Sequence, residues 1–220
     1  MRLIATGLIA IALIATGSMP AAAAGAVITG RVVGPDGQGI AEAVVFVEGP
    51  LPEAAASMAT ARTGEMDQVD KTFVPGLLPV VVGTKVRFPN HDQIHHHVYS
   101  FSRTKSFELP LYKGEDAAPV LFDNVGVVKI GCNIHDWMSA IILVLPTPWF
   151  AQTGADGRFE LAALPAGTYK LAAWHALSKV KLEDTEQSVQ VGASAPELSF
   201  SLSLSPARPR PAMRGNRREP

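Results

Sequence analysis

The chain has one cysteine among its 220 residues, so no internal disulfide can form. It also lacks a long helical hydrophobic period and a charge excess of either sign, because 19 basic residues are matched by 20 acidic ones. These absences disfavour a disulfide scaffold and a helical bundle. They also leave the single thiol, Cys132, in need of an explanation.

The first 24 residues have the layout of a secretory signal peptide. Arg2 precedes an apolar run from Leu3 to about Gly17, and small residues end in an A-x-A pattern at Ala22 to Ala24. The apolar core is short for a membrane span. We expect cleavage near Ala24 and a periplasmic or secreted mature protein without stable membrane insertion; an uncleaved membrane anchor is the alternative.

Arginines crowd the Pro-rich end of the chain, residues 205–220, and leave the remainder mildly acidic. An acidic body argues against a nucleic-acid partner. The tail is expected to be disordered, with docking to an acidic partner or a membrane surface as the alternative.

After the predicted signal peptide, the sequence consists of short β-branched and aromatic runs separated by Gly, Pro, Asn and Asp. This pattern is typical of strands, and it predicts an all-β fold. The strand-like runs lie within 26–48, 72–75, 77–88, 96–101, 120–122, 126–132, 140–145, 153–164, 165–174, 188–191 and 197–204.

The cysteine begins the motif C-x2-H-x2-M, formed by Cys132, His135 and Met138. Residues 126–132 alternate so that the Cys132 thiol leaves its strand on the same face as Val128 and Ile130. A free thiol in a secreted protein is liable to oxidation, so metal ligation explains Cys132 better than packing alone. We expect His135 and Met138 to fold back over the same end of a sandwich.

A further ligand is expected from residues 90–101, which hold four of the six histidines. A thiolate, two imidazoles and a thioether suit copper in a trigonal His2Cys site with a weak axial Met, although Zn(II) would fit the first three. The candidate histidines are His91, His95, His96 and His97. A second ion captured by His91 or His95 is a further possibility.

Residues 65–145 resemble a cupredoxin of the plastocyanin and amicyanin group. The resemblance lies in Val81 to Asn90, in His96-His97-Val98, in Gly126 and in the C-x2-H-x2-M loop, whose length is most similar to amicyanin. It implies a Greek-key β-sandwich and one copper ion alternating between Cu(I) and Cu(II). It also implies the ligands His96, Cys132, His135 and Met138. In this chain His95 and His97 replace the Pro and Asn that usually flank the upstream histidine, so His97 is the next choice for that ligand.

Two further segments, Gly30 to Val47 and Thr153 to Leu171, resemble successive parts of the carboxypeptidase regulatory-like, transthyretin-like β-sandwich. This resemblance implies a small sandwich, residues 25–50 and 147–204, with the cupredoxin domain, residues 58–146, inserted in one of its loops. Two domains in simple series are the alternative. The combination is similar to that of proteins labelled methylamine utilisation proteins.

A site whose ligands all come from the protein has no position for a substrate, so we expect an electron carrier and not an enzyme. By resemblance, redox partner proteins would dock at the surface around His135 and Trp137, with Ile134 and Ser139 at its rim. The rival functions are copper or zinc trafficking by the His-rich segment and a structural sandwich with an incidental cysteine.

Overall fold

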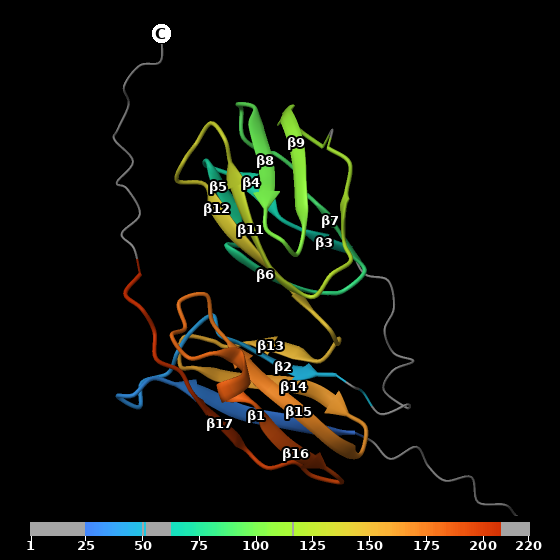
Figure 1. Cartoon of the computed structure of the whole chain (residues 1–220), viewed down its shortest axis with the longest axis vertical. Coiled ribbons are helices and arrows are strands. Elements are labelled where there is room, and N and C mark those ends of the chain that lie inside the picture. The colour runs from blue at the N-terminus through green and yellow to red at the C-terminus, as the bar shows by residue number, and fades with distance from the viewer. Residues whose placement is uncertain (1–24, 50, 52–62, 116, 208–220) are drawn as a thin grey trace, which may run out of the picture.

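The computed structural model describes residues 25–49, 51, 63–115 and 117–207 (Figure 1). Within them the only helix is a short 3-10 turn, η1 (Leu182–Thr185), and every other regular element is a strand. The predicted all-β class is therefore confirmed. The predicted signal peptide and most of the predicted tail lie outside the described residues. No helix in the described part is long and apolar enough to cross a membrane.

Strands from residues 63–145 form one body, the upper one in Figure 1. Its five-stranded sheet has the order β6-β12-β11-β8-β9, with bounds β6 Leu77–Val81, β8 His96–Phe101, β9 Ser106–Tyr112, β11 Gly126–Cys132 and β12 Ser139–Leu145. A three-stranded sheet has the order β10-β7-β3, formed by β3 Thr63–Glu65, β7 Thr84–Arg87 and β10 Val120–Phe122. The hairpin β4 (Asp67–Val69) and β5 (Thr72–Val74) completes the body.

The core of this body is an apolar cluster contributed by both sheets and the hairpin. Phe73, Phe88, Phe122 and Ile142 are nearly fully buried in it. The cluster includes Cys132, so the thiol leaves β11 on the core side, as the alternation of its strand predicts.

Strands from residues 26–48 and 150–201 share the other two sheets. The first has the order β14-β1-β17, formed by β1 Ala26–Val33, β14 Arg158–Leu164 and β17 Leu198–Ser201. The second has the order β13-β2-β15-β16, formed by β2 Val44–Glu48, β13 Phe150–Gln152, β15 Gly167–Trp174 and β16 Gln187–Val191. A separate apolar cluster fills the space between these two sheets.

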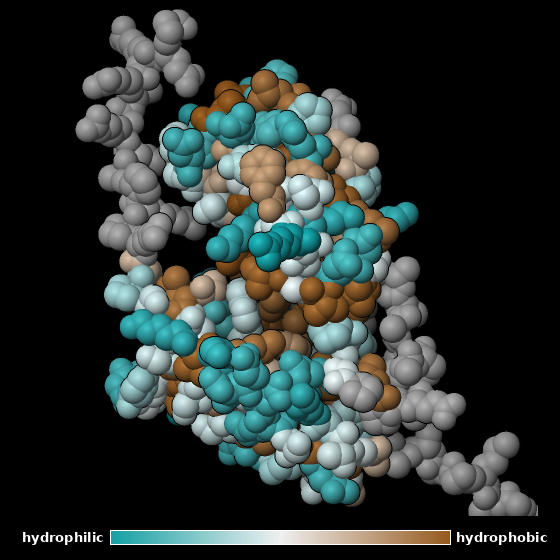
Figure 2. All heavy atoms as spheres, in the orientation of Figure 1, coloured by the Kyte–Doolittle hydropathy of each residue, from teal (hydrophilic) through white to brown (hydrophobic). Residues whose placement is uncertain are grey.

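A third apolar cluster joins the two bodies, and Figure 2 shows hydrophobic side chains gathered at the waist between them. Phe46 of β2 and Ala172 of β15 pack there with Leu143 and Leu145 of β12. β2 and β12 are apolar on both faces, since their alternate residues enter the core of their own body. Burial of both faces explains why residues 44–47 and 141–145 are continuous apolar runs.

The structure differs from the predicted strands in several places. The run 77–88 is two strands in different sheets, because Gly83 adopts a φ of 88° between β6 and β7. The runs 153–164 and 165–174 are expected to form a strand pair around Pro165 to Gly167. Both strands form, but β14 pairs with β1 while β15 pairs with β2 and β16. Four strands, β3, β4, β9 and β13, fall outside the predicted runs. β9 contains Pro110, and proline is tolerated at the sheet edge that β9 occupies.

Candidate metal centre

The first residue of β8 is His96, and its side chain is fully buried. Because a strand alternates its side chains, Val98 and Ser100 share this inner face, whereas His97 and Tyr99 lie on the other face. The alternation therefore places His96 inside the sandwich and excludes its neighbour His97 from the same position.

The last residue of β11 is Cys132. β11 runs antiparallel to β8 with Cys132 opposite Val98, so the thiol lies two residues along the neighbouring strand from His96. This register brings together two residues that are 36 positions apart in the chain.

The loop after Cys132 turns back on itself. The Met138 amide donates a hydrogen bond to the His135 carbonyl at 2.9 Å, and the Cys132 amide donates to the Met138 carbonyl at 3.3 Å. His135 is 7% exposed and Met138 is 2% exposed, and Met138 belongs to the same buried cluster as Cys132. The loop thus brings both predicted ligands to the buried side.

Three potential ligand atoms form a compact triangle. The Nδ1 atoms of His96 and His135 are 3.1 Å apart. The Cys132 Sγ lies 3.9 Å from Nδ1 of His96 and 3.8 Å from Nδ1 of His135. His96, Cys132 and His135 therefore form a buried candidate metal site.

The spacing and chemistry of this triangle fit a transition metal. Zinc bonds of about 2.0–2.1 Å to nitrogen and about 2.3 Å to sulfur would hold such ligand atoms about 3.3 to 3.8 Å apart. The observed separations of 3.1, 3.8 and 3.9 Å lie close to this range. The spacing does not choose the metal, and a thiolate with two imidazoles suits both copper and zinc.

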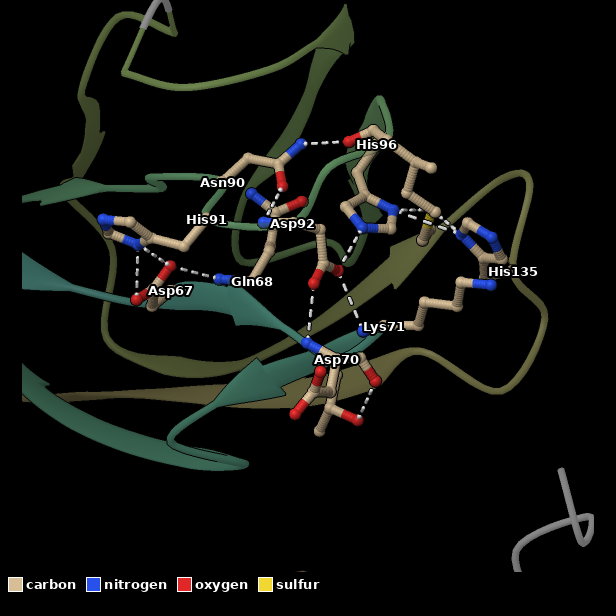
Figure 3. Close-up of polar contacts among 12 residues, drawn as sticks. Asp67, Gln68, Asp70, Lys71, Asn90, His91, Asp92, His96 and His135 are labelled. Carbon is tan, nitrogen blue, oxygen red and sulfur yellow. Dashed lines mark hydrogen bonds and ion pairs between the residues drawn. The ribbon is translucent and has the colours of Figure 1, made fainter.

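The other ring nitrogen of His96 contacts an acidic residue that the sequence analysis did not select (Figure 3). His96 Nε2 lies 2.7 Å from Oδ2 of Asp92. The Asp92 carboxylate also accepts hydrogen bonds from the amide of Asp70 at Oδ1 and from the amide of Lys71 at Oδ2. Burial alone would raise the pKa of Asp92, but the hydrogen bonds from His96 and the two amides outweigh it and lower that pKa below its ordinary value. The sequence feature that could have pointed to Asp92 is its position as an acidic residue within the His-rich residues 90–101.

The remaining histidines of residues 90–101 are not members of the triangle. His97 Nε2 pairs with Glu108 at 2.7 Å, and His91 Nδ1 pairs with Asp67 at 2.8 Å. His95 is exposed at the surface. The structure thus brings only His96 of these four to Cys132 and His135.

Apolar side chains surround the outer side of the site. His95, Leu111, Ile134 and His135 line a shallow pocket together with Ile94. Trp137 is 41% exposed, and its ring centroid lies 5.2 Å from that of His135. The triangle is therefore buried close beneath a partly apolar surface.

Fold and site together define an all-β protein with a buried His2Cys cluster. Solved structures similar to part of the chain include a purple cupredoxin from Nitrosopumilus maritimus, at 24% identity over 37% of this chain and 98% of that one, with a TM-score of 0.33. A reduced amicyanin variant is 23% identical over 46% of this chain and 97% of its own, with a TM-score of 0.35.

The copper-containing nitrite reductase from Thermus scotoductus SA-01 is 24% identical over 44% of this chain, with a TM-score of 0.36. The matched region spans only 27% of that chain. No family model matches the chain, and a search of curated proteins finds no match.

Proposed function

We propose that the protein is a secreted or periplasmic mononuclear type 1 copper protein that carries single electrons between redox partners. The observation that supports this most directly is the buried triangle of His96 Nδ1, His135 Nδ1 and Cys132 Sγ. In this proposal Met138 is the fourth, weak ligand. Bound copper would supply the interconversion of Cu(I) and Cu(II).

The chain's own residues would keep the site rigid and dry. Cys132 and Met138 lie in the apolar cluster of the upper body, and His96 is fully buried. With four protein ligands there would be no open position for a substrate, in contrast to catalytic metal sites. This closed ligand set is why we propose a carrier and not an enzyme.

The proposed port for electrons is the surface around His135. Ile134 and Trp137 are the exposed apolar residues on the loop that carries this histidine. Electron-transfer contacts are typically small and weak, so a partner protein would bind this surface briefly. We propose no nucleic-acid partner and no stable membrane insertion.

We further propose that residues 58–146 form a cupredoxin domain inserted in a regulatory-like sandwich made of residues 25–50 and 147–204. The packing of Phe46 and Ala172 against Leu143 and Leu145 supports a rigid support role for that sandwich. This sandwich packs against β6 and β12, which are the two strands of the five-stranded sheet farthest from the edge strand β9.

A second candidate function is copper or zinc trafficking by the His-rich segment. The exposure of His91 and His95 favours it, because exposed imidazoles can capture and release ions at the surface. This function would need several loosely bound ions and would not depend on Met138. Pairing of His91 with Asp67 weakens it, because one ring nitrogen is already engaged.

Addition of Cu(II) to the purified mature protein separates these functions. A carrier would bind one copper tightly and show an intense blue or green colour that reductant bleaches and Cys132→Ser abolishes. Colourless binding of several ions would indicate trafficking instead, and no stoichiometric binding would refute both. Nitrite turnover by the copper-loaded protein would contradict the assignment as a carrier.

A further inference from the structure

Asp92 joins the candidate metal site to a hairpin that carries no metal ligand. Its Oδ2 lies 2.7 Å from Nε2 of His96. The amide of Asp70 donates to Oδ1 at 2.7 Å, and the amide of Lys71 donates to Oδ2 at 2.8 Å. Figure 3 shows the carboxylate lying between the β4–β5 turn and the His96 ring.

The turn is a two-residue hairpin loop between β4 and β5, and the common type I′ form of such a loop requires a positive φ at both of its residues. Asp70 and Lys71 have φ values of 51° and 56°, in the left-handed region that residues other than glycine rarely occupy. Two successive residues in this region aim both amides at one point, and Asp92 fills it. The hairpin therefore holds the carboxylate in place.

The peptide chain around Asp92 is also restrained. Its amide donates to Oδ1 of Asn90 at 3.0 Å, while Nδ2 of Asn90 donates to the carbonyls of Ile94 and Tyr112 at 3.0 Å each. Asn90 is 2% exposed. The carboxylate thus approaches His96 from a loop that is restrained at several points.

A carboxylate only accepts hydrogen bonds, so a neutral His96 facing it carries its hydrogen on Nε2. The lone pair is then on Nδ1, and this atom is the one directed at Cys132 and His135. The opposite tautomer would point a hydrogen at the position where a metal ion would bind. Nδ1 of His135 can instead donate to the Nδ1 lone pair of His96 in the metal-free protein.

We propose that Asp92 is a positioning residue: held by the β4–β5 turn, it selects the Nε2–H tautomer of His96 and orients its Nδ1 lone pair toward Cys132 and His135. The role of this lone pair as a metal ligand rests on the proposed function. The tautomer itself is a property of the metal-free protein, and it can be tested separately.

The first experiment records long-range ¹⁵N–¹H NMR spectra of the metal-free mature protein at a pH where His96 is neutral. The Nε2–H form is expected for His96. In Asp92→Asn the amide group cannot accept from the ring and both turn amides as the carboxylate does, so the Nδ1–H form should grow. Glu108→Gln removes the carboxylate partner of the neighbouring His97 and should leave His96 unchanged.

A wild-type His96 in the Nδ1–H form would overturn the proposal even if Asp92→Asn fails to fold. An unchanged tautomer in a folded Asp92→Asn protein would overturn it too. Lys71→Gly is a control that removes only the Lys71 side chain. Glycine keeps the amide that contacts Asp92, and it adopts a positive φ readily. It should preserve the wild-type tautomer.

The second experiment measures Cu(II) affinity by competition with a chelator. Loss of a residue that hydrogen-bonds a metal-ligating histidine typically weakens metal binding about 10- to 100-fold, and this loss is expected for Asp92→Asn but not for Glu108→Gln. Equal affinities in the two variants would contradict the positioning role. Absence of the copper chromophore in the wild type would refute the proposed function, while the tautomer result would still stand.

Discussion

The sulfur of Cys132 and the Nδ1 atom of His96 lie 3.9 Å apart, although 36 residues separate the two in the chain. The antiparallel pairing of β8 and β11 sets this separation, because Cys132 lies opposite Val98 in the ladder. His135 reaches the same point through the loop that begins at Cys132. A ladder of backbone hydrogen bonds is rigid, so a metal ion would meet ligands that are already in place.

The alternation of β8 predicts opposite results for two adjacent histidines. Loss of a residue that hydrogen-bonds a metal ligand typically weakens metal binding about 10- to 100-fold. His96→Ala should weaken copper binding by more than this, because it removes a proposed ligand itself. His97→Ala should retain the affinity, since its ring pairs with Glu108 on the other face of the strand. Competition with a chelator measures both. A large loss in His97→Ala with normal binding in His96→Ala would reverse the assignment.

Two histidines outside the candidate site should have pKa values shifted in opposite directions from the ordinary value. The hydrogen bond and charge of Asp67 raise the pKa of His91, whereas burial lowers the pKa of His175. Ring-proton NMR titration should therefore give a higher midpoint for His91 than for His175.

The Asp67→Asn variant should lower the midpoint of His91 and leave that of His175 unchanged. Because the folded-state pKa of His91 is raised, its pairing with Asp67 stabilises the fold below the unfolded-state pKa. That contribution is lost as the pH rises through the folded-state value. A His91 midpoint that does not respond to Asp67→Asn would show that the pair does not form in solution.

Two glycines with the same backbone conformation should differ in their tolerance of alanine. Gly37 and Gly157 have φ values of 76° and 75°. Nothing lies within 4 Å of a Cβ atom placed at Gly37, so Gly37→Ala should cost about 1–2 kcal/mol for the left-handed conformation alone.

At Gly157 a Cβ atom would lie 2.3 Å from the carbonyl oxygen of Val32, and backbone cannot move aside easily. Gly157→Ala should therefore lower the free energy of unfolding by clearly more than Gly37→Ala. Urea denaturation measures both variants. Similar losses would show that the β13–β14 turn, which contains Gly157, is more open than the structure indicates.

The contact between the two bodies should contribute to stability. Leu145 is 1% exposed and lies in the cluster that joins them. Leu145→Ala should cost about 2–5 kcal/mol, because it removes buried methyl groups and leaves a cavity. Leu111→Ala is the matched control, since Leu111 is 57% exposed and its loss should change stability by no more than about 0.5 kcal/mol. Equal losses of stability in the two variants would mean that the apolar cluster between the two bodies is solvated.

Much of the local structure was predictable from the sequence because it depends on alternation along single strands. The burial of Val128, Ile130 and Cys132 follows from period-2 patterning. The all-β class follows from β-branched runs bounded by turn residues. Pairing was harder to predict, because β14 and β15 are neighbours in the chain yet lie in different sheets.

The sequence by itself determined the all-β class and the chemistry of the candidate ligands, since residue types and short spacings carry both. Only the tertiary structure decided which histidine meets Cys132, because the choice between His96 and His97 depends on which face of β8 turns inward. Only the tertiary structure revealed Asp92 as a partner of His96, because that contact requires the β4–β5 turn and the His-rich loop to meet in space. Contacts of this kind arise from chain segments that fold together, and no local pattern of residues records them.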